Sequence, residues 1–318
     1  MSKPLAPPTG FRIGHWTDKV GMTGCTVVIA PEGTRGGVDV RGGGPGTRET
    51  DVMGPLAGTD RVSAVTLAGG SAYGLAAADG VMAWLEGQGI GYPTLAGIVP
   101  IVPAAIVYDL AAGDPRARPD AAAGRAACEA AREGVPERGA VGAGTGTAAG
   151  KGLGREQAAA TGIGYATGRG GFGAMVAALA VANPFGDVLD EDGSVLAGAK
   201  AARTGDMLAA LEGDPLLAEE RNTSLVCLMT DATLDKAACA RVARAASAGI
   251  ARAVEPVFTD VDGDVVFCLA SGEHEPGGRF EVLQLQALAA RVTAAAIRDA
   301  AVQAHPPNER WRPRDTAP

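Results

Sequence analysis

Residues 221–231 read RNTSLVCLMTD, so a hydroxyl residue opens a strongly apolar segment directly after a polar one. The hydroxyl of Thr223 is therefore adjacent to the carbonyl group of Asn222. A hydroxyl held against that carbonyl can attack it and shift the acyl group from nitrogen to oxygen, which leaves an ester that water hydrolyses. Such a reaction would produce one chain that ends at Asn222 and another that begins at Thr223.

A threonine at a chain terminus carries both a nucleophilic Oγ1 and an α-amine with a pKa near about 8. The amine can accept the proton of its own hydroxyl near neutral pH, so one residue supplies the nucleophile and the base. Ser224 has the same hydroxyl chemistry one position further on and is the alternative nucleophile. The same pattern also occurs at ordinary loop-to-strand junctions, so the residues alone leave a purely structural interpretation open.

Two other motifs resemble functional signatures but lack their context. Residues 69–73 (GGSAY) approach the G-x-S-x-G turn of serine esterases, but Tyr73 stands where the second glycine is required. Residues 144–149 (GTGTAA) match a dinucleotide-binding fingerprint without the apolar strand that must precede it. Gly150-Lys151 likewise lacks the spacing of a phosphate-binding loop. We interpret these segments as structural turns.

The composition indicates a globular chain with many tight backbone positions. Of the 318 residues, 47 are glycine and 20 are proline, while 47% are hydrophobic and 20% are charged. This apolar fraction excludes a disordered chain. Glycine at about twice its usual share predicts sharp turns and close approaches of the backbone. The net charge of −8, without a basic run, argues against a nucleic-acid surface.

The five cysteines are scattered, with no C-x-x-C pair, which predicts reduced, buried thiols and argues against zinc. No segment resembles a signal peptide, and the most apolar stretch, residues 96–108, is short and contains two prolines. We therefore expect a cytoplasmic protein without a membrane partner, a metal or a cofactor.

Hydrophobic periodicity predicts strands and helices mixed along the chain, without a regular alternation or an internal repeat. Such an order favours a layered α+β fold. Residues 1–9 and 305–318 are expected to be flexible termini. The expected strands are 25–30, 62–68, 172–182, 186–196 (a hairpin), 223–230 and 264–270, and the expected helices are 75–85, 120–133, 200–212, 234–254 and 285–296.

Taken in order, the motifs resemble the DmpA/BapA family of self-processing aminopeptidases, which are related in fold to ornithine acetyltransferases. The matching stretches cover nearly the whole chain outside the termini and residues 190–220, and include GHWTD (14–18), VGAGTGTAAGKG (141–152), NPFGDV (183–188) and NTSLVCLMTDATL (222–234). The resemblance implies a DmpA/ArgJ-like four-layer α/β/β/α sandwich and an N-terminal-nucleophile hydrolase. It further implies that residues 1–318 form one domain that is cut into an α chain, 1–222, and a β chain, 223–318.

The resemblance also assigns roles to residues of this chain. Thr223 matches the nucleophile, Asn183 the oxyanion-hole amide and Tyr108 an active-site hydroxyl donor. A later pair falls at Asp262 and Asp264, and a strand there would place both on one face, whereas the Asp-Gly-Asp sequence also fits a turn. The peptidases compared have serine at the first position of the pair. A carboxylate there would favour a substrate ammonium or raise the pKa of its neighbour.

The function implied is an aminopeptidase or amidase that acts on small peptides, amides or esters without a cofactor. Two alternatives remain: acyl transfer of the ornithine acetyltransferase kind, and a family member that is neither cut nor catalytic. The resemblance also implies a homo-oligomer, a tetramer of cleaved α/β units.

Overall fold

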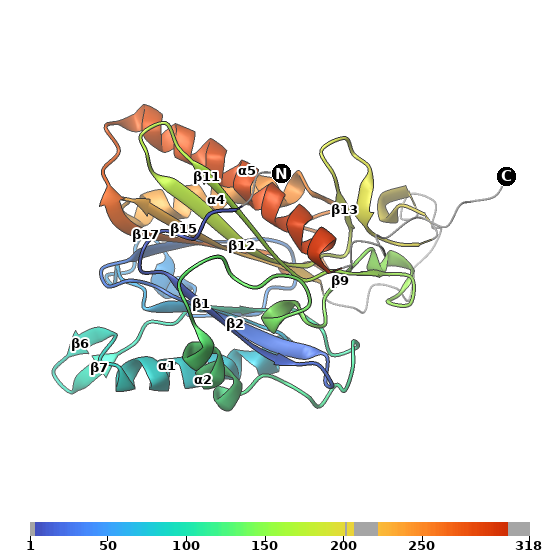
Figure 1. The fold of residues 1–318 in the computed structure, drawn as a ribbon, viewed down its shortest axis with the longest axis horizontal. Coiled ribbons are helices and arrows are strands. Elements are labelled where there is room, and N and C mark those ends of the chain that lie inside the picture. The colour runs from blue at the N-terminus through green and yellow to red at the C-terminus, as the bar shows by residue number, and fades with distance from the viewer. Residues whose placement is uncertain (1–3, 201, 207–221, 305–318) are drawn as a thin grey trace.

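The computed structural model describes residues 4–200, 202–206 and 222–304. Within them, two five-stranded sheets lie face to face, with helices on both outer faces (Figure 1). The first sheet has the order β1 (Arg12–Asp18), β2 (Thr23–Ile29), β5 (Ala64–Ala68), β8 (Ala104–Ile106) and β4 (Thr47–Arg48). The second has the order β11 (Ile163–Arg169), β12 (Met175–Asn183), β15 (Thr223–Ala232), β17 (Val265–His274) and β3 (Arg35–Val40).

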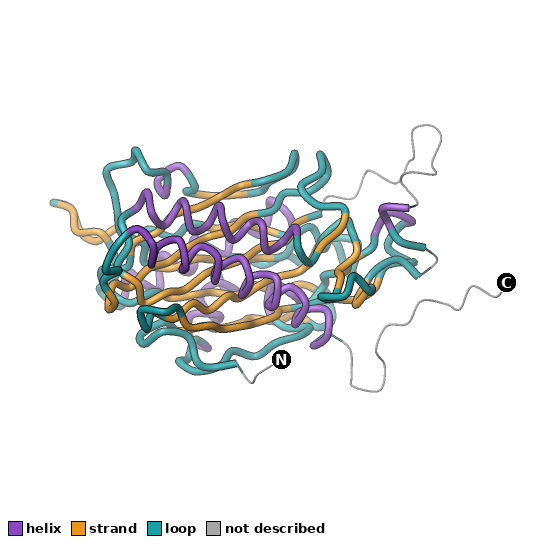
Figure 2. The backbone as a smooth tube through the Cα atoms, turned by 90° about the horizontal axis from the view of Figure 1, so that it is seen from above, coloured by secondary structure: helices purple, strands orange, loops and turns teal. Residues whose placement is uncertain are grey.

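Helices cover the outer face of each sheet and complete the four layers. The first sheet is covered by α1 (Ala77–Gly87) and α2 (Ala121–Ala130), and the second by α4 (Lys236–Ala251) and α5 (Arg279–Gln303). Seen from above, α4 and α5 lie over the strands of the second sheet (Figure 2). This order confirms the predicted α/β/β/α sandwich.

Shorter elements connect these layers. The remaining strands are β6 (Tyr92–Thr94), β7 (Gly97–Val99), β9 (Ala148–Ala149), β10 (Ala159–Ala160), β13 (Asp187–Leu189), β14 (Val195–Ala197) and β16 (Val254–Glu255). The short 3₁₀ helices are Asp51–Met53, Ser71–Ala76, Gly142–Gly144 and Lys151–Leu153.

The core consists of three apolar layers, and alternate residues of one strand belong to different layers. On β15, Leu225 packs between the two sheets, whereas Val226 packs against the α4/α5 layer. Every residue of β15 is buried. A strand that is covered on both faces has no polar side, which explains the unbroken apolar run at residues 225–229. All five cysteines are free and buried, as predicted.

Glycines on the strands let the helices approach the sheets closely. A Cβ at Gly164 of β11 would lie 2.0 Å from the carbonyl oxygen of Ala296 and 2.3 Å from the nitrogen of Ala300, both on α5. Gly14 of β1 faces α2 and Gly37 of β3 faces α4 in the same way. Part of the high glycine content therefore serves the packing of layers.

Substitution of Gly164 by alanine is expected to lower the free energy of unfolding by about 1–3 kcal/mol, because the new methyl group overlaps the backbone of α5. Gly87→Ala is the matched control, since a Cβ at Gly87 meets nothing within 4 Å. Urea denaturation of both variants measures the difference. Equal midpoints would contradict the packing role of Gly164.

Helix α5 is long and apolar enough to cross a membrane by length and composition alone, but 50% of its most apolar window is buried within the protein. It packs on α4, β11 and β12. We therefore assign α5 as a core helix of the sandwich.

The structure describes the N-terminal arm from residue 4 onward. Residues 4–9 are anchored, because the backbone N–H of Leu5 donates to Thr167 Oγ1 at 3.1 Å and Pro7 and Pro8 are buried. The predicted tail, residues 305–318, and most of the helix expected over 200–212 lie outside the described residues.

Candidate active site

The end of β12 and the start of β15 bring two predicted site residues together. Asn183, the last residue of β12, pairs with Thr223, the first residue of β15, in an antiparallel ladder. Residues opposite each other in such a ladder have Cβ atoms about 4.5–5.5 Å apart. Asn183 is 0% and Thr223 is 1% exposed. The amide and the hydroxyl therefore share a buried position at one end of the second sheet.

The peptide carbonyl of Asn222 receives two hydrogen bonds. Thr223 Oγ1 donates to the Asn222 oxygen at 2.5 Å, and the backbone N–H of Gly263 donates to the same oxygen at 2.8 Å. The N–H of Asn222 donates in turn to the carbonyl of Val261 at 2.9 Å. These contacts hold the Asn222–Thr223 bond, which is intact in this structure, against residues 261–263.

Asp262 and Asp264 lie just before β17, which begins at Val265, and Asp262 forms a parallel bridge with Asn222 that continues the register of β15 on β17. The glycine-rich segment at residues 42–44 packs closely on this sequence, because a Cβ at Gly263 would lie 2.4 Å from the carbonyl oxygen of Gly44. The N–H of Gly44 also donates to the carbonyl of Asp262 at 2.8 Å.

Asp262 is held by hydrogen bonds from two neighbouring segments. Its Oδ1 accepts from the N–H of Phe185 at 3.3 Å. Its Oδ2 accepts from the N–H of Thr259 at 3.0 Å and from Thr259 Oγ1 at 2.6 Å. These contacts link the segment before β17 to the segment after Asn183.

Asp264 is buried beside the nucleophile candidate. The N–H of Ser224 donates to its Oδ1 at 2.5 Å. Burial, with the nearby Asp262 carboxylate as the second cause, raises the pKa of Asp264 to about 8. A carboxylate at position 262 was expected either to favour a substrate ammonium group or to raise the pKa of its neighbour. The raised pKa of Asp264 agrees with the second expectation.

The side chain of Asn183 is oriented by three partners. Its Nδ2 donates to the main-chain carbonyl of Tyr108 at 3.1 Å. Its Oδ1 accepts from the N–H of Ala148 at 3.2 Å and from Lys151 Nζ at 2.8 Å. An asparagine amide nitrogen carries two N–H groups, so Nδ2 has a second N–H besides the one that donates to Tyr108.

Tyr108 reaches the site through its main-chain carbonyl, on a segment that buried hydrogen bonds hold in place. The next residue, Asp109, accepts from the N–H of Gly70 at 2.6 Å and from Thr23 Oγ1 at 2.7 Å. The segment that carries Tyr108 is thereby tied to two elements of the first sheet layer.

Lys151 is a site residue that the sequence reasoning missed. Its Nζ donates to Asn183 Oδ1 and also to the main-chain oxygen of Asn183, at 2.9 Å, and the residue is only 2% exposed. The signal in the sequence was a lysine among the small, apolar residues 141–152. A lysine in such surroundings is expected to be buried, and a buried charge requires partners. In the sequence, this lysine stands out only within a segment that resembles a phosphate-binding loop.

The glycine-rich loops do not all converge on the site. Residues 42–44 pack on the segment that carries Asp262, and residues 142–152 include Lys151, which donates a hydrogen bond to Asn183. Residues 170–173, by contrast, lie at the other end of the second sheet, where β12 begins.

The model of Peptidase family S58 matches residues 9–310 of this sequence. The chain belongs to peptidase family S58. This S58 peptidase is also similar to an uncharacterised aminopeptidase of Mycobacterium leprae, with 44% identity over 300 residues, 86% of this chain and 81% of the relative. A 6-aminohexanoate-oligomer endohydrolase of Agromyces sp. is 32% identical over 272 residues, which cover 83% of this chain and 74% of the relative. The family and these relatives establish the S58 protein as a hydrolase.

Solved structures share the fold of this S58 peptidase at low sequence identity. The L-aminopeptidase D-Ala-esterase/amidase from Ochrobactrum anthropi, described as a variant of the Ntn-hydrolase fold, superimposes with a TM-score of 0.71 and 18% identity, covering 96% of this chain and 89% of that one. A β-aminopeptidase from Burkholderia sp. gives a TM-score of 0.66 and 21% identity over 92% of this chain and 84% of that one. The four-layer sandwich is thus an Ntn-hydrolase fold.

Proposed function

We propose that this S58 peptidase cuts its own chain between Asn222 and Thr223 and then uses Thr223 as an N-terminal nucleophile. The observation that carries the proposal is the pair of contacts on the Asn222 carbonyl oxygen, one from Thr223 Oγ1 and one from the N–H of Gly263. The hydroxyl that would attack and an amide that would stabilise the developing charge are both in place. Thr223 is 1% exposed in the uncut chain, so the carbonyl group that its hydroxyl can reach first is that of Asn222 in the same chain.

The self-cleavage proceeds through an ester. Thr223 Oγ1 attacks the carbonyl carbon of Asn222 and gives up its proton, and the negative charge that forms on the carbonyl oxygen is stabilised by the N–H of Gly263. Such a donor contributes on the order of 3 kcal/mol to transition-state stabilisation. When the C–N bond breaks, the nitrogen of Thr223 takes up the proton that Oγ1 gave up and becomes a free amine. Water then hydrolyses the ester, leaving a carboxylate at Asn222 and a restored hydroxyl.

Turnover of substrates repeats the same chemistry on an external amide or ester. The α-amine of Thr223 accepts the proton of Oγ1 as the hydroxyl attacks, and Nδ2 of Asn183 donates to the oxyanion. Lys151 fixes the orientation of Asn183 and places a positive charge next to it. Asp264, which accepts the backbone N–H of Ser224, is proposed to bind the new α-amine of Thr223. Tyr108 holds Nδ2 through its carbonyl, and its hydroxyl is proposed to contact the substrate.

We propose short peptides, amides or esters as the substrates. The similar proteins are named as aminopeptidases and as a hydrolase of 6-aminohexanoate oligomers, whose names refer to cleavage of amide bonds. These relatives favour hydrolysis over acyl transfer. The carboxylate of Asp262 suits a substrate that carries an ammonium group. The cytoplasmic location and the tetramer remain predictions.

Denaturing gel electrophoresis tests the self-cleavage directly. Purified protein should separate into residues 1–222 and residues 223–318, and sequencing of the smaller fragment should begin Thr-Ser-Leu-Val. A single full-length band that persists through prolonged incubation would contradict the proposal.

The raised pKa of Asp264 predicts how the stability of the uncut chain depends on pH. In the folded chain the carboxyl group of Asp264 stays protonated up to about pH 8, whereas its ordinary pKa is 3.8. Between these two pH values the folded state therefore binds more protons than the unfolded state. Stability is therefore highest below about pH 4 with respect to this group and falls as the pH rises toward 8. Urea midpoints of Thr223→Ala at pH 5, 6.5 and 8 should decline.

The control is the double variant Thr223→Ala/Asp264→Asn, which has no carboxyl group to ionise at this position. Its urea midpoint should change less across the same three pH values. If both proteins show the same slope, the pKa of Asp264 is not the cause of the decline.

A further inference from the structure

A second group of polar side chains lies at the end of the second sheet that is remote from Thr223. Asp231 is near the end of β15, and Glu273 and His274 end β17. Each offers one ligand atom, and these three atoms lie within 4.8 Å of one another. We propose that the three residues form a binding site for a divalent transition-metal ion, with zinc as the representative.

An irregularity between two parallel strands brings the three side chains together. The pairing of Thr230 with Ala270 is followed by that of Ala232 with His274, so β17 contains extra residues at this point. Gly272 accommodates the bulge with a φ of 89°. Successive side chains of a regular strand point to opposite faces, whereas a bulge redirects them. This explains how the adjacent Glu273 and His274 both approach Asp231.

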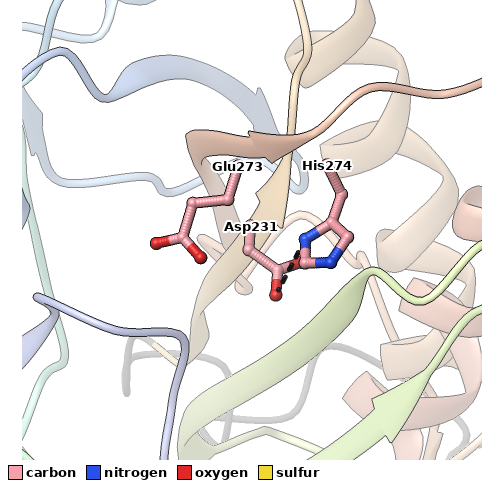
Figure 3. A group of neighbouring side chains, drawn as sticks. All are labelled: Asp231, Glu273 and His274. Atoms are coloured by element: carbon pink, nitrogen blue, oxygen red, sulfur yellow. Dashed lines mark ion pairs between the residues drawn. The ribbon is translucent and has the colours of Figure 1, made fainter.

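The distance between two of the donor atoms matches that in the site of a small tetrahedral ion, and all three atoms lie within 4.8 Å of one another. The distance between His274 Nδ1 and Asp231 Oδ2 is 3.5 Å. Metal bonds of about 2.0–2.2 Å in a tetrahedral zinc site separate two ligand atoms by about 3.3–3.6 Å. Figure 3 shows the Asp231 side chain between those of Glu273 and His274.

Hydrogen bonding leaves the inward-facing atoms available. Asp231 Oδ1 accepts the N–H of Met175 at 2.7 Å, which orients the carboxylate and leaves Oδ2 toward the histidine. His274 Nδ1 is buried and has no hydrogen-bond partner among the residues that the structure describes. An outer hydrogen bond that fixes a ligating carboxylate is the usual support of a metal site.

The donor set also indicates which ions would bind. A neutral imidazole with two carboxylates supplies two negative charges, which balance a divalent cation, and imidazole nitrogen favours zinc and related metals over magnesium or calcium. Glu273 is exposed and His274 partly exposed, so an ion can enter from solvent and water can complete its coordination. The site would tie the end of β15 to the end of β17. We expect it to stabilise the sheet rather than to take part in hydrolysis.

The test is zinc binding by the full chain after removal of metals with a chelator. Isothermal titration should show one zinc ion per chain, and the melting temperature should rise with zinc concentration. His274→Ala should weaken zinc binding at least about ten-fold, since even loss of an outer partner commonly weakens metal binding by about 10–100-fold. Glu273→Gln should also weaken it, whereas the matched control Glu275→Gln, at an exposed neighbouring position, should bind as the unaltered chain does.

Three results would overturn the site: no stoichiometric zinc binding, zinc binding that His274→Ala leaves unchanged, or full zinc affinity in Glu273→Gln. A simple Asp231–His274 ion pair predicts that His274→Ala lowers the melting temperature equally with and without zinc, which would also contradict the metal site. The titration repeated on Thr223→Ala, which lacks the proposed nucleophile, should give the same affinity. The inference is thus tested independently of the peptidase reaction.

Discussion

Replacement of Thr223 by alanine is expected to leave the chain uncut and to abolish hydrolysis. The variant lacks the hydroxyl that donates to the Asn222 carbonyl at 2.5 Å, and no new amine terminus can form. Removal of the nucleophile of a serine hydrolase lowers kcat by about 10⁶-fold, and we expect a loss of the same order here. Gel electrophoresis and turnover of aminoacyl p-nitroanilides measure the two effects.

Two variants at the same junction serve as controls. Thr223→Ser keeps the hydroxyl and should both cut and turn over substrate. Ser224→Ala should still be cut at the Asn222–Thr223 bond, because the amide group of Ser224, which contacts Asp264, is unchanged. Hydrolysis by Thr223→Ala, or a new terminus that begins at Ser224, would show that Thr223 is not the nucleophile.

Replacement of Asn183 by alanine is expected to lower kcat by about 10²–10³-fold, the usual effect of losing one oxyanion donor. Self-cleavage should be slowed much less, because the Asn222 oxygen is bound by the N–H of Gly263 and by Thr223 itself. The measurement compares the rate of cutting with the kcat of the fully cut protein. The proposal assigns the Asn183 amide to substrate turnover and the N–H of Gly263 to self-cleavage. Equal slowing of both reactions would contradict this assignment.

The strands that the sequence predicts best are those buried on both faces. Residues 225–229 of β15 and 175–182 of β12 form continuous apolar runs, and their burial explains why the pattern is so clear. Strands β1, β3 and β11 were not predicted, because each has glycines where a helix packs against it. The apolar pattern is missing at those positions since the contact is made by backbone.

The site depends on information that no local pattern contains. Thr223 and Asn183 were assigned from motifs, but their pairing requires the register of β12 against β15. Lys151 was missed because its burial next to Asn183 is visible only in the folded chain. The cluster around His274 likewise depends on a bulge between two strands.

The strand order of the second sheet has a consequence for the reversibility of folding. Strands β15 and β17 follow the proposed cut, yet they lie between β12 and β3, which precede it (Figure 1). Before cutting, one molecule folds into this interleaved sheet. After cutting, complete unfolding would release two molecules, and recovery would require them to meet again, so that it would depend on their concentration. The lifetime of the cut enzyme would then be set by a slow rate of unfolding rather than by an equilibrium between folded and unfolded chains.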